Sequence, residues 1–275
     1  MTDLAERYDR VAAGYLQWWA PVLEPRAVEL LERIDEAVAT GKGAVRLLDI
    51  GTGTGTLARA AVRRWPRVEV VGIDVSSGMA EVAEGEADRQ LTADERSRLS
   101  TRVAPAGELP FADGSFDAAM SSFVLQLVPN RYRALREAHR VLRPGGLLAY
   151  VTWLVDDRRF KPDEILDDAL DEIGFGAREP EKRSGDVPGS ESAAAQLRRA
   201  GFHKAKAERA ELEYAFSVDH YIAFVTEFDE ETLFNELTPD ERTRVVDGMR
   251  RRLSRLRPED LVLRYPIVYA SGVRP

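Results

Sequence analysis

The sequence predicts an α/β protein with a doubly wound, Rossmann-like sheet. Short apolar segments typical of buried strands alternate with helical segments over residues 44–155, which favours a parallel sheet covered on both faces. The chain has 275 residues, 44% of them hydrophobic, so a large core is expected. A glycine-rich turn, "GTGTG" at 51–55, follows the first strand, where sheets of this kind bind ligands.

The elements of the first half follow from periodicity and from helix-boundary residues. The first 34 residues have a helical pattern, with an interruption expected at Pro21 and Pro25. Ser76 or Ser77 is a suitable cap for the second helix behind the glycine turn, and "RPGG" closes the third. The expected strands are 44–50, 68–75, 101–106 (weak), a segment that begins at 116, and 147–155; the expected helices are 56–65, 77–91 and 131–142.

The second half is less regular but shows no linker. The alternation weakens over 156–192, and 184–192 has the composition of a loop. A helix (192–202), a strand (204–217), a helical stretch (219–257) and a closing strand (262–275) are expected after it. We therefore expect one domain, residues 1–275, with a cofactor-binding core at 44–155 and helical lid or substrate elements at 1–34 and 216–257.

Composition excludes several classes of function. The chain has no cysteine, so disulfides, thiolate metal sites and cysteine nucleophiles are absent. No apolar stretch is long enough for a membrane span, and the charged start "MTDLAERYDR" is unlike a signal peptide, so a cytoplasmic protein is expected. The net charge of −8 argues against a nucleic-acid partner. Seven arginines between Arg242 and Arg257 are interpreted as the solvated face of a helix; the alternative is a grip on an anionic substrate.

The glycine turn and the following strand together indicate an adenosine-containing ligand. A dinucleotide site needs G-x-G-x-x-G, whereas Thr56 occupies the third glycine position here and Gly55 comes one residue early. Asp74 ends the second strand, where a carboxylate can accept hydrogen bonds from both ribose hydroxyls. Both NAD sites and S-adenosylmethionine (SAM) sites use such a carboxylate. A purely capping aspartate is the alternative, but Ser76 and Ser77 already suit that role.

Five motifs in order resemble the class I SAM-dependent methyltransferases, in particular the small-molecule group related to quinone-biosynthesis methyltransferases. They are "LLDIGTGTG", "GIDVSSGM", "LPFADGSFD", "SSFVLQLVPN" and "REAHRVLRPGG". The resemblance covers residues 8–155 well and the rest loosely. It implies a seven-stranded sheet, mostly parallel, whose last strand is antiparallel, and "VLRYPIVYASGVR" suits that strand.

The resemblance also implies a set of cofactor-binding residues. Asp49 and the backbone of residues 51–53 would hold the methionine part of SAM, and Asp74 would bind the ribose hydroxyls. Val75 and Met79 would pack on the adenine, whose edge the backbone of 106–107 would reach. The full expected set is Tyr15, Asp49, Gly51, Thr52, Gly53, Gly55, Asp74, Val75, Met79, Ala106, Gly107 and Ser121, with Ser121 at the amino group and Tyr15 closing over the site from the first helix.

The sequence departs from the family pattern at one position. Relatives often read D-A-E-x-L-P-F before the fourth strand, and the aspartate bonds the adenine amino group. This chain reads "PAGELPF", with Pro105 at that position. Proline has neither a carboxylate nor an N–H. The adenine amine must therefore find a backbone carbonyl, water or another side chain.

The methyl acceptor leaves few marks in the sequence. An N-P-P-Y-like motif, typical of amino-group methylation of adenine or glutamine, is absent, and without a cysteine cytosine C5 methylation is excluded. Asp156 and Asp157 could serve a metal but are better read as a solvated loop, so no metal is expected. Of three histidines, His220 is the candidate base; the alternative is an exposed polar residue. Two stripes at helical spacing could roof the cleft or be core: Tyr8, Tyr15, Trp18 and Trp19, and Tyr221, Phe224 and Phe228, with Trp153 at the tip of the fifth strand.

These observations predict methyl transfer from SAM to a small, largely apolar acceptor by in-line displacement, with O, N or C of the acceptor left open. A SAM-binding protein without methyl transfer is the main alternative, because of Pro105. An NAD(P)-dependent oxidoreductase is the second, disfavoured by Thr56 and by the lack of a hydride-transfer constellation. The sequence gives no indication of an oligomeric state.

Overall fold

A computed structural model describes residues 2–40, 43–176 and 185–275, and the chain divides into two compact units. Unit 1 comprises Met1–Val155, Ser184–Ala210 and Pro266–Pro275. Unit 2 comprises Asp156–Arg183 and Glu211–Tyr265. Two long strands, β6 (His203–Ala215) and β7 (Val262–Val273), contribute residues to both units.

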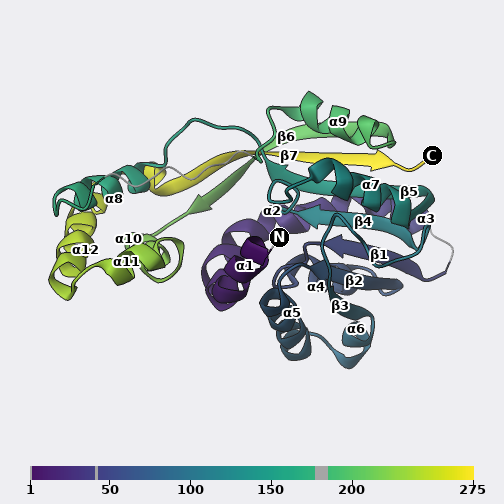
Figure 1. Ribbon diagram of the computed structural model, residues 1–275, viewed down its shortest axis with the longest axis horizontal. Helices are drawn as coiled ribbons and strands as arrows, with labels where there is room; N and C mark the ends of the chain where they lie inside the picture. The colour runs from purple at the N-terminus through teal and green to yellow at the C-terminus, as the bar shows by residue number, and fades with distance from the viewer. Residues whose placement is uncertain (1, 41–42, 177–184) are drawn as a thin grey trace. The chain divides into compact units, whose positions relative to one another are not determined.

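Unit 1 is built on the seven-stranded sheet that the sequence predicts, in the order β3-β2-β1-β4-β5-β7-β6 (Figure 1). The first five strands pair in parallel, and β7 pairs antiparallel with β5. The fold class is therefore confirmed, including the antiparallel last strand. The strands in chain order are β1 (Val45–Ile50), β2 (Val68–Asp74), β3 (Leu99–Val103), β4 (Phe116–Ser122) and β5 (Leu142–Trp153), followed by β6 and β7.

Helices connect the parallel strands and bury their apolar faces against the sheet. Alternate residues of β1 point to opposite faces, so Leu48 and Ile50 share a core with α7 and α9, whereas Leu47 is buried on the other side. Ser76 caps α5 through its hydroxyl, and Asn130 caps α7 in the same way. The helices are α4 (Thr56–Arg64), α5 (Ser77–Gln90), α6 (Ala93–Ser97), α7 (Arg131–Val141) and α9 (Ser190–Arg199).

The N-terminal region is helical, but the expected break at the two prolines is absent. Pro21 lies at the start of α2 and Pro25 lies inside it. A π-helical turn, η1, precedes Pro21, and its wider winding makes room where a proline ring would clash with an α-helical carbonyl. The elements are α1 (Thr2–Gly14), η1 (Tyr15–Trp19), α2 (Ala20–Glu29), the 3₁₀ turn η2 (Leu30–Arg33) and α3 (Asp35–Thr40).

Helix α1 is attached to the start of α5 by one carboxylate. Asp9 accepts hydrogen bonds from the Ser76 hydroxyl (2.6 Å) and from the Gly78 amide (2.8 Å). These bonds hold the pKa of Asp9 below its usual value. A Cβ on Gly78 would lie 3.1 Å from the Asp9 backbone, so the two helices approach each other closely.

Unit 2 is helical, with the ends of β6 and β7 attached. Aromatic rings pack around Phe216, including Tyr221 and Phe224, and Tyr221 donates a hydrogen bond of 2.6 Å to Asp163. Within this unit α12 packs on α8 and α10. Its elements are α8 (Lys161–Asp171), α10 (Val218–Phe224), the π-helical turn η3 (Val225–Asp229), α11 (Glu231–Glu236), α12 (Pro239–Leu253) and the 3₁₀ turn η4 (Pro258–Leu261).

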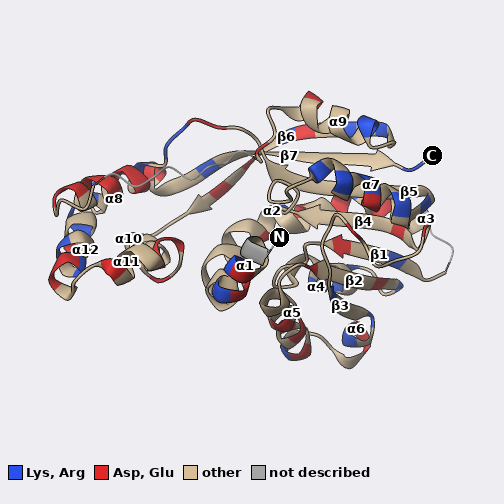
Figure 2. Ribbon diagram, in the orientation of Figure 1, with Lys and Arg blue, Asp and Glu red and all other residues tan. Residues whose placement is uncertain are grey.

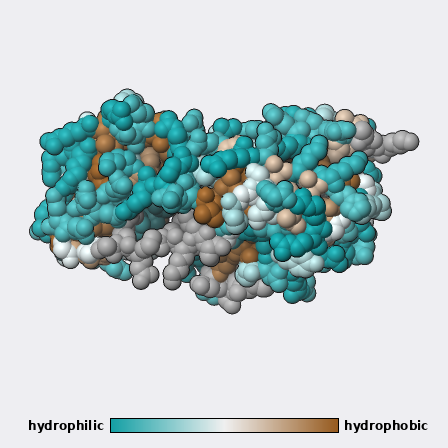
Figure 3. All heavy atoms as spheres, turned by 90° about the horizontal axis from the view of Figure 1, so that it is seen from above, coloured by the Kyte–Doolittle hydropathy of each residue, from teal (hydrophilic) through white to brown (hydrophobic). Residues whose placement is uncertain are grey.

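The arginine-rich segment of unit 2 is a helix with an apolar and a charged face. Val245, Met249 and Leu253 are buried, whereas the arginines around them are mostly exposed. Arg250 pairs with Asp219 and Arg252 with Glu172. Figure 2 shows basic residues along α12 and acidic ones along α8, and Figure 3 shows apolar side chains of unit 2 surrounded by hydrophilic ones. The solvated-face interpretation of this segment therefore agrees with the structure.

Among the helices of the described residues, none has both the length and the apolar composition that crossing a membrane requires.

Candidate cofactor and acceptor site

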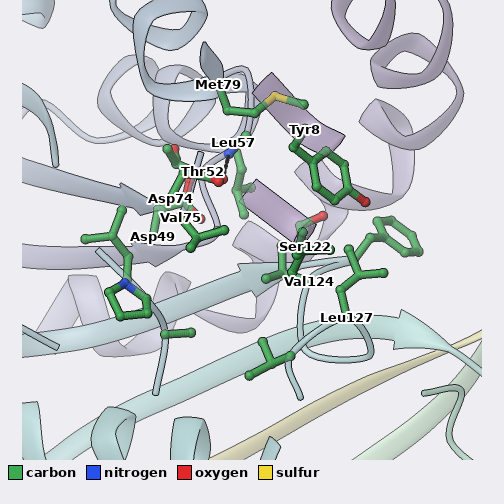
Figure 4. A pocket seen from close by; sticks show the side chains of 18 of the residues that line it. Tyr8, Asp49, Thr52, Leu57, Asp74, Val75, Met79, Ser122, Val124 and Leu127 are labelled. Atoms are coloured by element: carbon green, nitrogen blue, oxygen red, sulfur yellow. Dashed lines mark hydrogen bonds between the residues drawn. The ribbon is translucent and has the colours of Figure 1, made fainter. Parts of the chain in front are cut away.

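A cavity of about 250 Å³ opens in unit 1 at the carboxyl ends of β1, β2 and β4. One side, here called the carboxylate wall, consists of Asp49, Thr52, Gly53 and Asp74. Another side, the apolar wall, consists of Tyr8, Leu23, Phe123, Val124 and Leu127. In Figure 4, Tyr8 and Leu127 lie together on one side and Asp49, Asp74 and Val75 on the other. The cavity therefore has a polar and an apolar part.

The three glycines of the turn have three different surroundings, and all have positive φ angles that suit glycine. A Cβ on Gly51 would lie 2.3 Å from a methyl of Val124, so this glycine lets the turn approach the loop after β4. A Cβ on Gly53 would meet nothing within 4 Å, so Gly53 leaves bare backbone at the cavity. Gly55 is the N-cap of α4, and a Cβ there would lie 3.0 Å from Ala83. Of the three, Gly55 does not line the cavity.

Asp49 is a buried carboxyl at the floor of the turn. It is 1% exposed, and the Thr52 hydroxyl donates to it over 2.9 Å. Burial raises the pKa of Asp49 to about 7; the Thr52 hydrogen bond opposes this rise, and the Asp74 charge adds to it. A cationic group in the cavity would favour the ionised form, so Asp49 suits the ammonium of an amino acid.

Asp74 lies at the tip of β2, as the sequence predicts. Its two carboxylate oxygens accept from the amides of Gly53 (2.8 Å) and Ser76 (3.0 Å). Burial raises the pKa of Asp74, and the backbone hydrogen bonds act in the opposite direction. Each oxygen keeps a second lone pair, so the carboxylate can also accept from two ligand hydroxyls.

The expected adenine-binding residues come together from two segments of the chain. Val75 and Met79, at the start of α5, line the cavity together with Ala106 and Gly107. Pro105 lines it too, so the residue that departs from the family pattern lies at the cavity itself. Val75, Met79 and Pro105 offer an apolar surface for a planar ring, and the segment 104–107 offers backbone carbonyls.

The loop after β4 contains a strained residue. Phe123 has a φ of +54°, which is unusual for a bulky side chain, and it stacks on Trp153 with ring centroids 4.5 Å apart. The Gln126 side-chain amide donates to the Phe123 carbonyl (2.6 Å), and the Thr152 hydroxyl donates to Gln126 (2.6 Å). This chain of hydrogen bonds fixes the Phe123 backbone in the apolar wall.

Ser121 and Gly55 do not line the cavity, and the candidate base His220 lies in unit 2. Ser121 is 1% exposed and donates to the Ile50 carbonyl (2.8 Å), while its neighbour Ser122 lines the cavity. Strand alternation explains this, because a shift of one residue changes the face of the sheet. Tyr15 lines the cavity, and burial raises its pKa, so its hydroxyl stays protonated. His220 lies within unit 2 beside Tyr214, 3.4 Å from its hydroxyl.

Several cavity residues carried no signal in the sequence. Leu23 and Glu24 come from α2, whose pattern is that of an ordinary amphipathic helix. Glu108 and Arg133 line the cavity and form an ion pair of 3.2 Å. Leu127 belongs to a motif that the resemblance includes, and its lining role could have been proposed from its place after the fourth strand.

The residues present fit SAM. The carboxylates of Asp49 and Asp74 suit its ammonium, its sulfonium charge and its ribose hydroxyls, and the apolar side chains suit its adenine. Within the described residues no group of three or more acidic or histidine side chains could hold a metal ion. The arrangement can bind a cationic adenosyl amino acid and hold an apolar molecule next to it.

Together, the sheet order and a glycine-turn cavity define a Rossmann-like methyltransferase fold. The family model described as "Methyltransferase domain" matches residues 48–150. A solved structure with this fold, the YcgJ protein from Bacillus subtilis, superposes with a TM-score of 0.56 at 20% identity, over 89% of this chain and 97% of that one.

Curated relatives point the same way. The chain is 44% identical over 107 residues to the ubiquinone/menaquinone biosynthesis C-methyltransferase UbiE of Geobacter sp. (strain M21), covering 38% of this chain and 43% of that protein. It is 33% identical over 180 residues to the UbiE protein of Dinoroseobacter shibae, covering 60% and 69%. It is 38% identical over 143 residues to the 27-O-demethylrifamycin SV methyltransferase of Amycolatopsis mediterranei, covering 52% and 50%.

The chain belongs to the class I SAM-dependent methyltransferases, whose cofactor is SAM. It spans less than half of the length of the first curated relatives that it matches.

Proposed function

We propose that this chain transfers a methyl group from SAM to a small, largely apolar acceptor. The observation that carries the proposal is the cavity, in which the buried carboxyl of Asp49, the half-buried carboxylate of Asp74 and an apolar wall line one space. Family membership supports the cofactor. The names of the relatives, one a C-methyltransferase and one acting on an O-demethylated compound, support a small-molecule acceptor.

The residues of this chain act by binding, orientation and exclusion of water. Bound SAM would supply a methyl group on a positively charged sulfur. An aligned nucleophilic atom of the acceptor would bond to the methyl carbon as the carbon–sulfur bond breaks, and SAH would leave. Asp74 and the turn fix the two ends of the cofactor, and Asp49 holds its ammonium. Tyr8 and Leu127 enclose the acceptor and exclude water.

Polar groups of the acceptor have few partners in this cavity. Arg133 is the one cation among the described lining residues, and it pairs with Glu108. Four lining carboxylates, those of Glu24, Asp49, Asp74 and Glu108, repel an anionic acceptor. A neutral molecule therefore suits the site better than a carboxylate, a phosphate or a nucleic acid.

The helical segments 1–34 and 216–257 are proposed as lid or substrate elements. Tyr8 and Tyr15 support this for the first segment, because both line the cavity and their rings meet edge to face 6.2 Å apart. Tyr221 and Phe224 are buried within unit 2. Hydrogen exchange with and without S-adenosylhomocysteine (SAH), the product of SAM, is the test. Equal protection of residues 216–257 in both states would reject the lid role of that segment.

The decisive experiment has two stages. Calorimetry should show binding of SAM and SAH and no binding of NAD, and NAD binding with SAM no better than millimolar would reject the cofactor assignment. Incubation with methyl-labelled SAM and a small-molecule extract should then give a labelled product that carries one added methyl group. Binding without any methylated product would instead support the SAM-binding protein that Pro105 kept open.

Total RNA, DNA and protein serve as competing acceptors in the same assay. Labelling of RNA that falls steeply with salt would overturn the small-molecule proposal, because phosphate contacts release counterions.

A further inference from the structure

Arg59 is a buried charge that the proposed reaction does not use. It lies in α4 and is 5% exposed. Among the described residues the buried charged side chains are Asp49 and Arg59, and both belong to the glycine turn and the helix after it. A buried guanidinium is unfavourable unless it is paired, so its position needs a reason.

The guanidinium of Arg59 holds the backbone of the turn. Its Nη1 donates to the carbonyl of Thr54 over 2.5 Å. A Cβ on Gly55 would lie 3.1 Å from the same nitrogen, so the side chain lies directly against residues 54–55. Thr54 lines the cavity and is itself 3% exposed, whereas Arg59 does not line the cavity. Arg59 therefore supports the turn from behind the cavity wall.

Other side chains hold the rest of the turn. Asp74 accepts from the Gly53 amide, and Asp49 accepts from the Thr52 hydroxyl. These two carboxyl groups hold the donors of the turn, and Arg59 holds an acceptor. The turn is thus fixed from both sides before any ligand enters.

The positive charge of Arg59 also offsets part of the negative charge at the cavity. The cavity contains four carboxylates, and its lining cation Arg133 is paired with Glu108. Burial lowers the pKa of Arg59, and the nearby carboxylates of Glu86 and Glu24 oppose that shift. An α-amino acid carries a carboxylate besides its ammonium, and Arg59 is the buried cation nearest in sequence to the turn that would receive it.

We propose that Arg59 is a positioning residue that shapes residues 53–56 for the amino-acid end of the cofactor and supplies a positive charge behind them for its carboxylate. The inference rests on the proposed function, because it takes SAM as the ligand. It predicts that Arg59 affects recognition of the amino-acid end and leaves recognition of the adenosine end unchanged.

Two ligands separate these ends. SAH has the amino-acid group, whereas methylthioadenosine has the adenosine and a thioether without it. In R59M the dissociation constant of SAH should rise about ten- to a hundred-fold, as expected for hydrogen bonds that involve a charged group. That of methylthioadenosine should stay within about two-fold of wild type. R59K keeps the positive charge but lacks the planar guanidinium, so its SAH dissociation constant should lie between those of wild type and R59M.

The matched control is R63M, on the same helix. Arg63 is exposed and donates to the Gln90 carbonyl, away from the turn. It should leave both dissociation constants unchanged. Circular dichroism melts of all variants check the fold. If R59M does not fold, R59K replaces it in the test: the inference then requires that R59K raises the SAH dissociation constant more than the methylthioadenosine constant.

The outcomes are distinct. If wild type binds neither ligand, the proposed function is wrong. If wild type binds both and R59M weakens both by the same factor, Arg59 supports the whole site and the inference is wrong. An unchanged SAH constant in folded R59M overturns it as well.

Discussion

The carboxylate wall and the apolar wall of the cavity are held in place by different forces. In the carboxylate wall, the Thr52 hydroxyl donates to Asp49 and the Gly53 amide donates to Asp74, so hydrogen bonds fix the position of each carboxyl group. In the apolar wall, the aliphatic side chains of Leu23, Val124 and Leu127 have no hydrogen-bonding groups, and the hydrogen bond from Gln126 fixes only the backbone of Phe123. Hydrogen bonding fixes geometry for one ligand, whereas apolar packing tolerates different shapes. The difference suits a constant cofactor and a variable acceptor.

The strongest test of this comparison is at Gly51, which lies between Asp49 and Thr52 of the carboxylate wall in the sequence and lies against Val124 of the apolar wall. G51A places a methyl where Val124 already lies and requires a left-handed backbone from alanine. We expect a loss of about 2–5 kcal/mol in the free energy of unfolding, measured with urea. The double variant G51A/V124A should recover part of that loss. G53A, with open space around the added methyl, should lose only about 1–2 kcal/mol from its backbone angle.

If G51A is as stable as wild type, or if V124A rescues nothing, the contact between the walls is not the reason for this glycine.

The second test removes a carboxylate from the polar side. D74A should raise the dissociation constants of both SAH and methylthioadenosine about ten- to a hundred-fold, because both ligands contain the ribose. This pattern differs from the one expected for R59M, which spares the second ligand. Asp94→Ala is the matched control, since its side chain is 81% exposed. Unchanged affinity in folded D74A would remove this residue from the site.

The third test uses pH. The folded pKa of Asp49 is about 7, above the ordinary value of about 3.9, because burial favours the neutral form. The folded state therefore binds the extra proton, and the free protein loses stability as pH rises from about 4 to about 7. A ligand ammonium needs the ionised carboxylate, so SAH affinity should rise about ten-fold from about pH 6 to pH 8. Calorimetry across that range measures it.

D49N cannot titrate at this position, and its SAH affinity should be nearly flat over the same range. An equally steep pH profile in D49N would assign the titration to another group.

The smallest change in cofactor affinity is expected from a substitution in the apolar wall. L127A should leave the SAH dissociation constant within about two-fold, since Leu127 belongs to the apolar wall and has no polar group with which to bind the cofactor. Labelling of the small-molecule extract should fall in the same variant, because the acceptor loses part of its enclosure. A large loss of SAH affinity would show that the two walls do not divide their roles in this way.

The sequence predicted the carboxylate wall better than the apolar wall, for a physical reason. The glycine turn and Asp74 follow directly from strand ends, which the chain direction of a parallel sheet brings to one edge, whereas Asp49 and Thr52 were expected from the family resemblance. Leu23 and Glu24 reach the cavity through the packing of α2, which no local pattern specifies. Ser121 shows the limit of inference from strand ends. A shift of one residue along the strand changes which side chain faces the cavity, and Ser122 lines it instead of Ser121.

The fold was predictable because its signals are local and repeated. Strand and helix periodicity identified β1, β2 and β4 and the helices after them within a few residues. The fifth strand was expected at 147–155, but β5 begins at Leu142 and contains the "RPGG" that was expected to form a turn, because this segment continues the extended backbone after α7. The π-helical turn at Tyr15–Trp19 was not predicted, since it depends on how the chain accommodates Pro21. Arg59 was not predicted either, because an arginine at this helical spacing suits a solvent face equally well.

The bond between Asp9 and the Gly78 amide joins residues 69 positions apart. Ribosomes add about 5–20 residues per second, so the partner of Asp9 appears several seconds after Asp9 itself. During synthesis α1 must wait, with Tyr8 unburied, until β1 and β2 have formed and α5 has begun. The cavity is therefore completed late in synthesis. Until then α1 is exposed, and it is the first helix available to a chaperone.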